Sequence, residues 1–187
     1  MNFTTYLVLY ILLGFIPQAV GSAICLYSIN KQSIVSKSFW YTSIIYALVS
    51  TAIRLAYDYG VIDFGFHTVI IWMIFIVIAI FYNKFPVIQS TVSIMVSGLL
   101  ITVAELITAV AFVICLGSQV FEDIMSCTLE IDGQMLSEIE GKALKTACGV
   151  PANFLFVVIT IVFYIVMKKR YEKKQHETSN KGEEKDT

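Results

Sequence analysis

Long apolar runs separated by short polar linkers make up most of the sequence. Five of these runs approach the ~20 residues that a helix needs to cross a bilayer at a rise of ~1.5 Å per residue. They cover residues 4–29, 39–57, 66–82, 91–117 and 150–167. The pattern predicts an all-α integral membrane protein with about five transmembrane helices.

The polar linkers alternate in charge along the chain. Linkers 30–38 and 83–90 and the segment 168–174 carry Lys or Arg, whereas linker 58–65 has only acidic charges and linker 118–149 is mainly acidic. Cytoplasmic loops close to membrane helices retain an excess of Lys and Arg. We therefore expect a multi-pass protein of the plasma membrane with its N-terminus outside and its C-terminus in the cytoplasm.

The same pattern divides the chain into two regions. Residues 1–170 form the predicted transmembrane domain, in which 118–149 is an outer loop with a short amphipathic helix over 135–144. Residues 171–187 form a charged cytoplasmic tail without large apolar side chains after Tyr171. Such a segment cannot bury enough apolar surface to fold, so the sequence predicts disorder there.

Composition narrows the function classes. Hydrophobic residues make up 57% of the chain and charged residues 14%, whereas soluble domains carry about 25% charged residues. No basic patch alternates with aromatic residues, so nucleic-acid binding has no support. Neither an HExxH motif nor acidic residues at metal-ligand spacing occur. The lipid bilayer is the expected partner, and we expect no metal, no cofactor and no enzymatic activity.

Three of the predicted helices carry a stripe of small and weakly polar residues. Such stripes let helix backbones approach closely and hydrogen-bond away from lipid. Gln18, Ser50 and Ser97 mark this secondary polar or packing face on the first, second and fourth helices. Pro17 removes one backbone hydrogen bond from the first helix and should kink it.

Two charged residues lie inside apolar runs, where charge is costly and usually functional. Arg54 lies in the second helix and Glu105 in the fourth. Counted from the cytoplasmic ends, both are ~21 to 23 Å up their helices. The matching depth predicts an intramembrane Arg54–Glu105 ion pair. It would either fix the register of the helices or take part in binding and switching.

His67 opens the third helix at a similar depth. An unperturbed imidazole titrates near pH ~6.5, so it could sense pH or bind a polar ligand group together with Arg54 and Glu105. The alternative is an interfacial anchor or a hydrogen-bond donor at the start of the helix. We take Arg54, His67 and Glu105 as the candidate ligand-binding or relay residues.

The four cysteines divide by location. Cys25 and Cys115 lie within apolar runs and are expected to be small packing residues. Cys127 and Cys148 lie in the predicted outer loop. These two could close a disulfide if the outer face is oxidising, although spacing alone does not establish the geometry.

The arrangement resembles the N-terminal membrane sensor region of bacterial peptide-sensing histidine kinases of the accessory-gene-regulator type, whose catalytic half is a GHKL ATPase. The matching features are Arg54 near the outer end of the second helix, the Gly-x-His-Thr start of the third helix at 65–68, and Glu105 inside the fourth. A Gly-x-Pro start of the fifth helix at 149–151 and the basic exit at 168–170 complete the likeness. The resemblance spans most of residues 4–170.

The resemblance implies a non-enzymatic sensor for an extracellular signal, such as a secreted peptide, that relays it to the cytoplasm as a homodimer or with a histidine-kinase partner. No phosphoacceptor region and no ATPase domain follow residue 170. One alternative is a small-solute-binding subunit of a membrane transporter. Another is a degenerate relative of the intramembrane enzymes that process signalling peptides, which place a Cys seven residues after a His; here that position is Ile74.

Overall fold

The computed structural model describes residues 5, 8–58, 66–126, 130–131, 134–135 and 138–183. Nearly all of these residues are helical. In chain order the elements are the π-helical turn η1 (Tyr10–Phe15), α2 (Ile16–Ile29), α3 (Lys37–Asp58), α4 (Phe66–Phe81), α5 (Val87–Leu116), α6 (Ser118–Ser126), the two-residue strands β1 (Glu130–Ile131) and β2 (Gln134–Met135), and α7 (Glu138–Glu183). The strands pair antiparallel.

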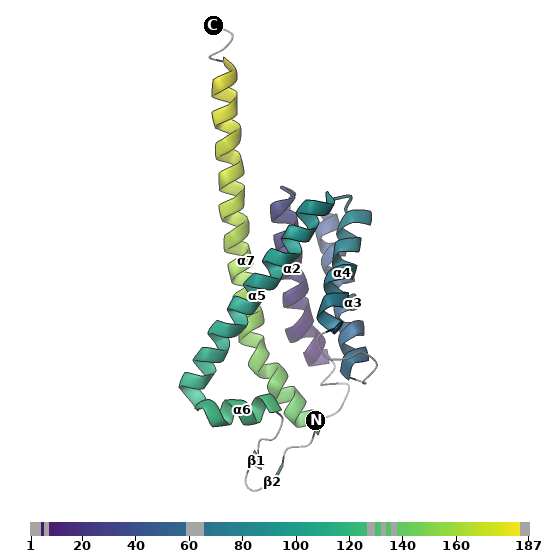
Figure 1. Ribbon diagram of the computed structural model, residues 1–187, viewed down its shortest axis with the longest axis vertical. Helices are drawn as coiled ribbons and strands as arrows, with labels where there is room; N and C mark the ends of the chain where they lie inside the picture. Colours follow the sequence, from purple (N-terminus) through teal and green to yellow (C-terminus); the bar gives the residue numbers. More distant parts are fainter. Residues whose placement is uncertain are drawn as a thin grey trace.

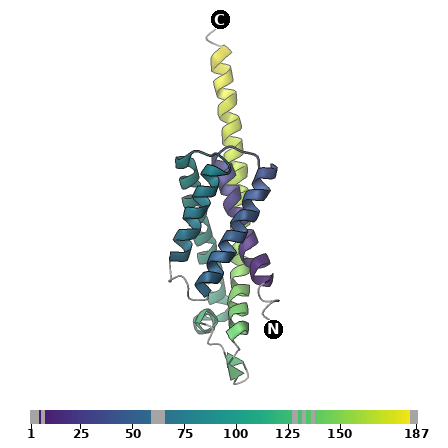
Figure 2. The ribbon, with the colours of Figure 1, turned by 90° about the vertical axis from the view of Figure 1, so that its right-hand side faces the viewer.

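The helices form a bundle with α2 at its centre. α2 contacts α3, α5 and α7, and α4 joins α3 to α5. α6, β1 and β2 lie at one end of the bundle, which we call the α6 end (Figure 1, Figure 2). α7 runs through the bundle and leaves it at the opposite end, the exit end, where the turns at 30–36 and 82–86 also lie.

Four helical segments are long and apolar enough to cross a membrane. They are Tyr10–Ile29, Lys37–Tyr57, Val87–Leu116 and Glu140–Lys173. The all-α class predicted from the sequence is therefore confirmed. The fifth predicted helix corresponds to α4, whose apolar part His67–Phe81 is shorter. At 16 residues, α4 is ~24 Å long, less than the ~30 Å thickness of the hydrocarbon core. Five crossings therefore stay a prediction.

The segments expected as outer loop and tail differ from the structure. α6 occupies part of 118–149, and α7 begins at Glu138 instead of residue 150. A proline favours the first turn of a helix, which is why the sequence suggested a start next to Pro151. In the structure Pro151 lies inside α7 and removes only one backbone hydrogen bond. α7 also continues to Glu183, through Lys, Glu and Gln residues that favour helix.

Two glycines allow close packing between helices. A Cβ on Gly21 of α2 would collide with the ring of Phe156, which is fully buried on α7. A Cβ on Gly98 of α5 would lie 2.7 Å from the indole of Trp72 on α4. Small residues at such crossings let large side chains fill the space against the neighbouring backbone. These contacts hold α7 against α2 and α4 against α5.

A partly buried polar network ties the elements together at the exit end. The Tyr27 hydroxyl lies 2.8 Å from Asn83 Oδ1 and 2.9 Å from Ser38 Oγ, and Thr42 Oγ1 donates to the same Asn83 oxygen at 3.1 Å. Tyr27 is 2% exposed, and Phe39 and Phe85 pack edge-on against its ring. We call Tyr27, Ser38, Thr42 and Asn83 the exit-end network. It joins α2, α3 and the turn before α5.

Candidate functional site

Two of the predicted site residues meet at the α6 end of the bundle. Arg54 lies in the last turns of α3 and His67 in the first turn of α4, and these helices are neighbours in contact. Arg54 Nη1 lies 3.5 Å from His67 Nε2. A guanidinium can only donate, so a hydrogen bond here requires an Nε2 that accepts, with the imidazole neutral. His67 is 7% exposed and Arg54 half-buried.

Tyr57 completes this side of the site. Its ring lies over the His67 imidazole, with the centroids 4.6 Å apart and the planes at 30°. Tyr57 is not among the site residues predicted from the sequence. Its position one turn after Arg54 was the signal available, because residues three apart share a helix face.

Glu105 does not form the ion pair predicted with Arg54. The charge of Arg54 acts electrostatically on its carboxyl group, but neither a direct ion pair nor a hydrogen bond joins Glu105 to any residue that the structure describes. Glu105 is exposed although it lies inside an apolar helix. Counting residues along each helix predicts how deep Arg54 and Glu105 lie in the membrane. It does not predict the lateral distance between the two helices that carry them. We call Arg54, Tyr57, His67 and Glu105 the α6-end cluster.

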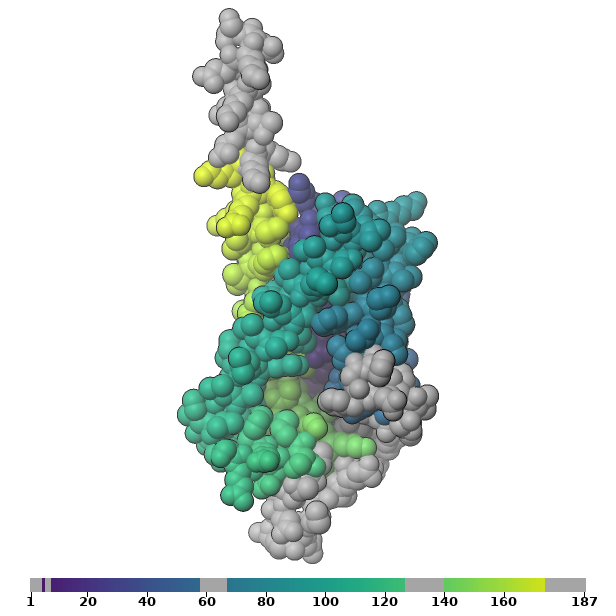
Figure 3. All heavy atoms as spheres, viewed as in Figure 1, coloured from purple at the N-terminus to yellow at the C-terminus, as the bar shows by residue number. Residues whose placement is uncertain are grey.

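The course of α5 explains the separation. All buried residues of α5 lie between Ser90 and Thr108, and the helix beyond Thr108 has none. In Figure 1, α5 crosses α7 and diverges from the rest of the bundle toward α6. The space-filling view shows a hollow between α5 and α4 on this side, with α2 and α7 behind it (Figure 3). Glu105 therefore lies on a helix that diverges from the rest of the bundle.

The residues predicted as a secondary polar face lie in the bundle. Ser50 donates to the Tyr46 carbonyl oxygen on its own helix at 2.7 Å. Ser97 Oγ donates to Ser22 Oγ at 2.8 Å, where α5 packs on α2. Both serines are buried, but only the hydrogen bond of Ser97 joins two helices.

Gln18 belongs to a contact that the sequence did not reveal. Pro17 has no N–H, so the Leu13 carbonyl loses its usual helical donor. Asn153 of α7 replaces that donor, with its Nδ2 3.1 Å from the Leu13 oxygen. Gln18 Nε2 in turn donates to Asn153 Oδ1 at 2.9 Å. A side chain from α7 thereby stabilises the junction of η1 and α2 at Pro17, and the kink itself stays a prediction. A polar residue just after Pro151 was the only signal in the sequence.

The cysteine predictions are only partly within the described residues. Cys127 lies outside them, so its pairing with Cys148 stays a prediction. Cys148 is half-buried on α7, Cys25 is fully buried in α2, and Cys115 is exposed near the end of α5. Across the described ranges, no group of three His, Cys, Asp or Glu side chains could hold a metal ion.

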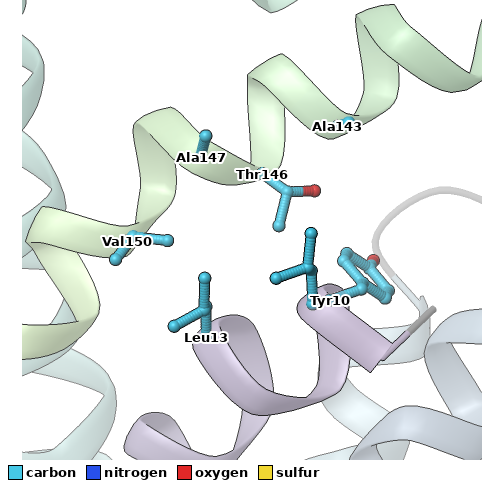
Figure 4. A pocket seen from close by; sticks show the side chains of 7 residues that line it. Tyr10, Leu13, Ala143, Thr146, Ala147 and Val150 are labelled. Carbon is cyan, nitrogen blue, oxygen red and sulfur yellow. The ribbon is translucent and has the colours of Figure 1, made fainter. Parts of the chain in front are cut away.

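A small cavity lies between η1 and the first half of α7. Its volume is about 60 Å³, and its lining comes from Leu9, Tyr10, Leu13, Ala143, Thr146, Ala147 and Val150 (Figure 4). The accessible lining is apolar. Sites for small molecules enclose roughly 300 to 1,000 Å³ and present a few polar groups. This cavity does not have the character of a solute-binding site.

Comparison of the chain with protein-family models, with curated proteins and with solved structures finds no match.

Proposed function

We propose that the chain is a multi-pass sensor module of the plasma membrane that binds an extracellular signal at the α6-end cluster and relays it to the cytoplasm through α7. The observation that carries this proposal is the continuity of α7. At 46 residues, the helix is ~69 Å long, far more than the ~30 Å of a hydrocarbon core. A shift at one end of such a helix is carried to the other.

The contacts of α7 support a relay. α7 packs against α5, which bears Glu105, and against η1 and α2. A signal that changed the distance between Arg54 and Glu105 would move α5, and α5 contacts α7 directly. The Asn153 side chain couples α7 to η1 through the Leu13 carbonyl. Both routes end on the basic exit at 168–170, the segment that the charge pattern assigns to the cytoplasm.

The alternatives receive less support from the geometry. A solute-binding transporter subunit calls for an outward-facing polar cavity, and the cavity between η1 and α7 does not supply one, because it is small and apolar. A peptide-processing enzyme of that kind calls for a Cys seven residues after the His, and Ile74 occupies that position after His67. A homodimer or a histidine-kinase partner fits the sensor proposal, since α7 extends beyond the bundle at the exit end.

The relay can be tested without knowing the signal. We would place the full chain in lipid nanodiscs and follow amide hydrogen exchange across residues 168–183 by mass spectrometry. Arg54→Leu removes the cation of the α6-end cluster and should change exchange in that segment at least threefold. Leu48→Ala, on the exposed face of the same helix, is the matched control and should leave it unchanged. Equal exchange in Arg54→Leu and the parent chain would rule out coupling along α7.

A further inference from the structure

Glu105 has an unusual environment for a carboxylate. It is exposed, it has no hydrogen bond or ion pair with any described residue, and apolar side chains flank it on α5. Leu106 is 63% exposed and Val110 51%. Charge in such a position is strongly disfavoured unless a partner neutralises it. Within the part of the chain that the structure describes, Arg54 acts on Glu105 electrostatically, but no group forms an ion pair with it.

The contact between α4 and α5 places Glu105 along the hollow. Trp72 packs on Gly98, and Glu105 follows Gly98 by seven residues, which returns it to nearly the same face of α5. Thr68 precedes Trp72 by one turn and is exposed. The two antiparallel helices therefore present Glu105 on one wall and Thr68 and Trp72 on the other.

Arg54 leaves the Glu105 carboxylate without a direct ion pair. Its Nη1 lies 3.5 Å from His67 Nε2, and its charge acts on Glu105 only at a distance. The Tyr57 ring covers the imidazole. A second cation of modest size can therefore approach Glu105 from the hollow, and an aromatic face at Trp72 favours such a group.

We propose that the hollow between α4 and α5 binds an amphiphile that carries a primary ammonium or guanidinium group and an apolar body, with the cation paired to Glu105. The occupant reaches the site from the aqueous phase on the α6 side. Charge complementarity defines it: a carboxylate, an indole and apolar walls match a hydrophobic cation and reject a hydrophobic anion. This inference rests on the proposed function, since it names the chemistry of the signal.

Trp72 supplies a reporter for the test. The chain has two tryptophans. Trp40→Phe leaves Trp72, beside the hollow, as the single tryptophan. We would titrate decylammonium into this variant in phosphatidylcholine nanodiscs, with decanol and decanoate as uncharged and anionic comparators. We expect a saturable change in Trp72 emission with decylammonium alone. An equal response to decanol would overturn the proposal.

Variants separate the carboxylate from general partitioning into lipid. Glu105→Gln should weaken decylammonium binding at least tenfold, Glu105→Asp should retain most of it, and Glu122→Gln on the exposed face of α6 should not change it. Unchanged binding in Glu105→Gln would overturn the proposal. Phosphatidylethanolamine in the nanodisc tests whether the ammonium group comes from a lipid. If this lipid competes with decylammonium in a Glu105-dependent way, the occupant does not come from the aqueous phase.

The two proposals fail in different ways. Decylammonium binding that depends on Glu105 but leaves exchange in 168–183 unchanged supports this inference and goes against the relay. Exchange that responds to Arg54→Leu, without Glu105-dependent binding, supports the relay and overturns the cationic occupant.

Discussion

Two polar clusters lie at opposite ends of the same bundle and are built in opposite ways. In the exit-end network every side chain is uncharged and has a hydrogen-bond partner within the network. The α6-end cluster contains both signs of charge, but Arg54 bonds to His67 and Glu105 stands apart and exposed. The members of the exit-end network satisfy one another's hydrogen bonds, whereas the α6-end cluster leaves Glu105 without an ion pair among the described residues.

This difference between the two clusters indicates which of them stabilises the fold and which is a candidate for binding. In an apolar medium, neutral groups that satisfy one another hold helices together, whereas a charge without a partner costs free energy. On insertion scales an acidic or basic residue at the centre of a membrane helix costs about 3 kcal/mol. Among the residues that the structure describes, the α6-end cluster leaves a carboxylate without an ion pair, which is poorly explained as a structural support. Our proposal is that a further partner binds there.

Asn83→Leu should have the largest effect. It removes the oxygen that accepts hydrogen bonds from Tyr27, Ser38 and Thr42, and it leaves buried hydroxyl groups with fewer partners. We expect a loss of about 2 to 3 kcal/mol in the free energy of unfolding, measured by SDS titration in micelles. The exposed neighbour variant Tyr82→Leu should change it by less than about 0.5 kcal/mol. Equal effects of the two variants would contradict a stabilising network.

Asn153→Ala should cost less, about 1 kcal/mol, because side-chain hydrogen bonds between membrane helices are modest. The Leu13 carbonyl would lose its donor. Pro17→Ala restores a backbone N–H that can bond to the same carbonyl. The double variant should therefore recover part of the lost stability, and a double-mutant cycle measures this coupling. Strictly additive effects would refute the replacement of the missing donor by Asn153.

Tyr171→Ala should have a smaller, local effect at the exit end. Lys31 Nζ lies 4.7 Å from the centre of the Tyr171 ring, and such a contact is worth about 0.5 kcal/mol at an exposed site. We expect faster amide exchange around residue 171 in Tyr171→Ala and parent-like exchange in Tyr171→Phe, which keeps the aromatic face. Identical exchange in the two variants would rule out a role for the ring.

Glu105→Gln should not destabilise the fold. Since Glu105 forms no ion pair or hydrogen bond with the described residues, removal of its charge breaks no contact there. We expect the free energy of unfolding in the same SDS titration to fall by no more than about 0.5 kcal/mol from the parent value. A loss above about 1 kcal/mol would show that Glu105 stabilises the fold and would erase the contrast between the two clusters.

The helices could be predicted from the sequence better than the contacts among them. Each of the five apolar runs coincides with a helix, because the hydrophobic pattern and the absence of breakers act locally. The start of α7 could not be predicted, since Pro151 is tolerated inside it. The pairing of Arg54 with His67 depends on the contact between α3 and α4, and the isolation of Glu105 depends on the divergence of α5.

The residues that the sequence missed share a physical reason. Asn153 and Asn83 bond to groups far away in the chain, on other helices or turns. Nothing in their own neighbourhood reveals that partner. Tyr57 could have been found, because it shares a helix face with Arg54. Long-range polar contacts between helices are thus the part of the site that a single sequence leaves open.

The short length of α4 has a consequence for where the protein would function. If α4 crosses the membrane as predicted, its ~24 Å length is mismatched to a ~30 Å hydrocarbon core, and the bilayer would adapt by thinning around it. Thinning beside α4 would draw the headgroup region down toward His67 and Glu105. The acyl-chain length of the lipids would then set how far below the membrane surface the cation-binding site at Glu105 lies. The same protein should accept its occupant more readily in a membrane of short-chain lipids than in a thick, ordered one.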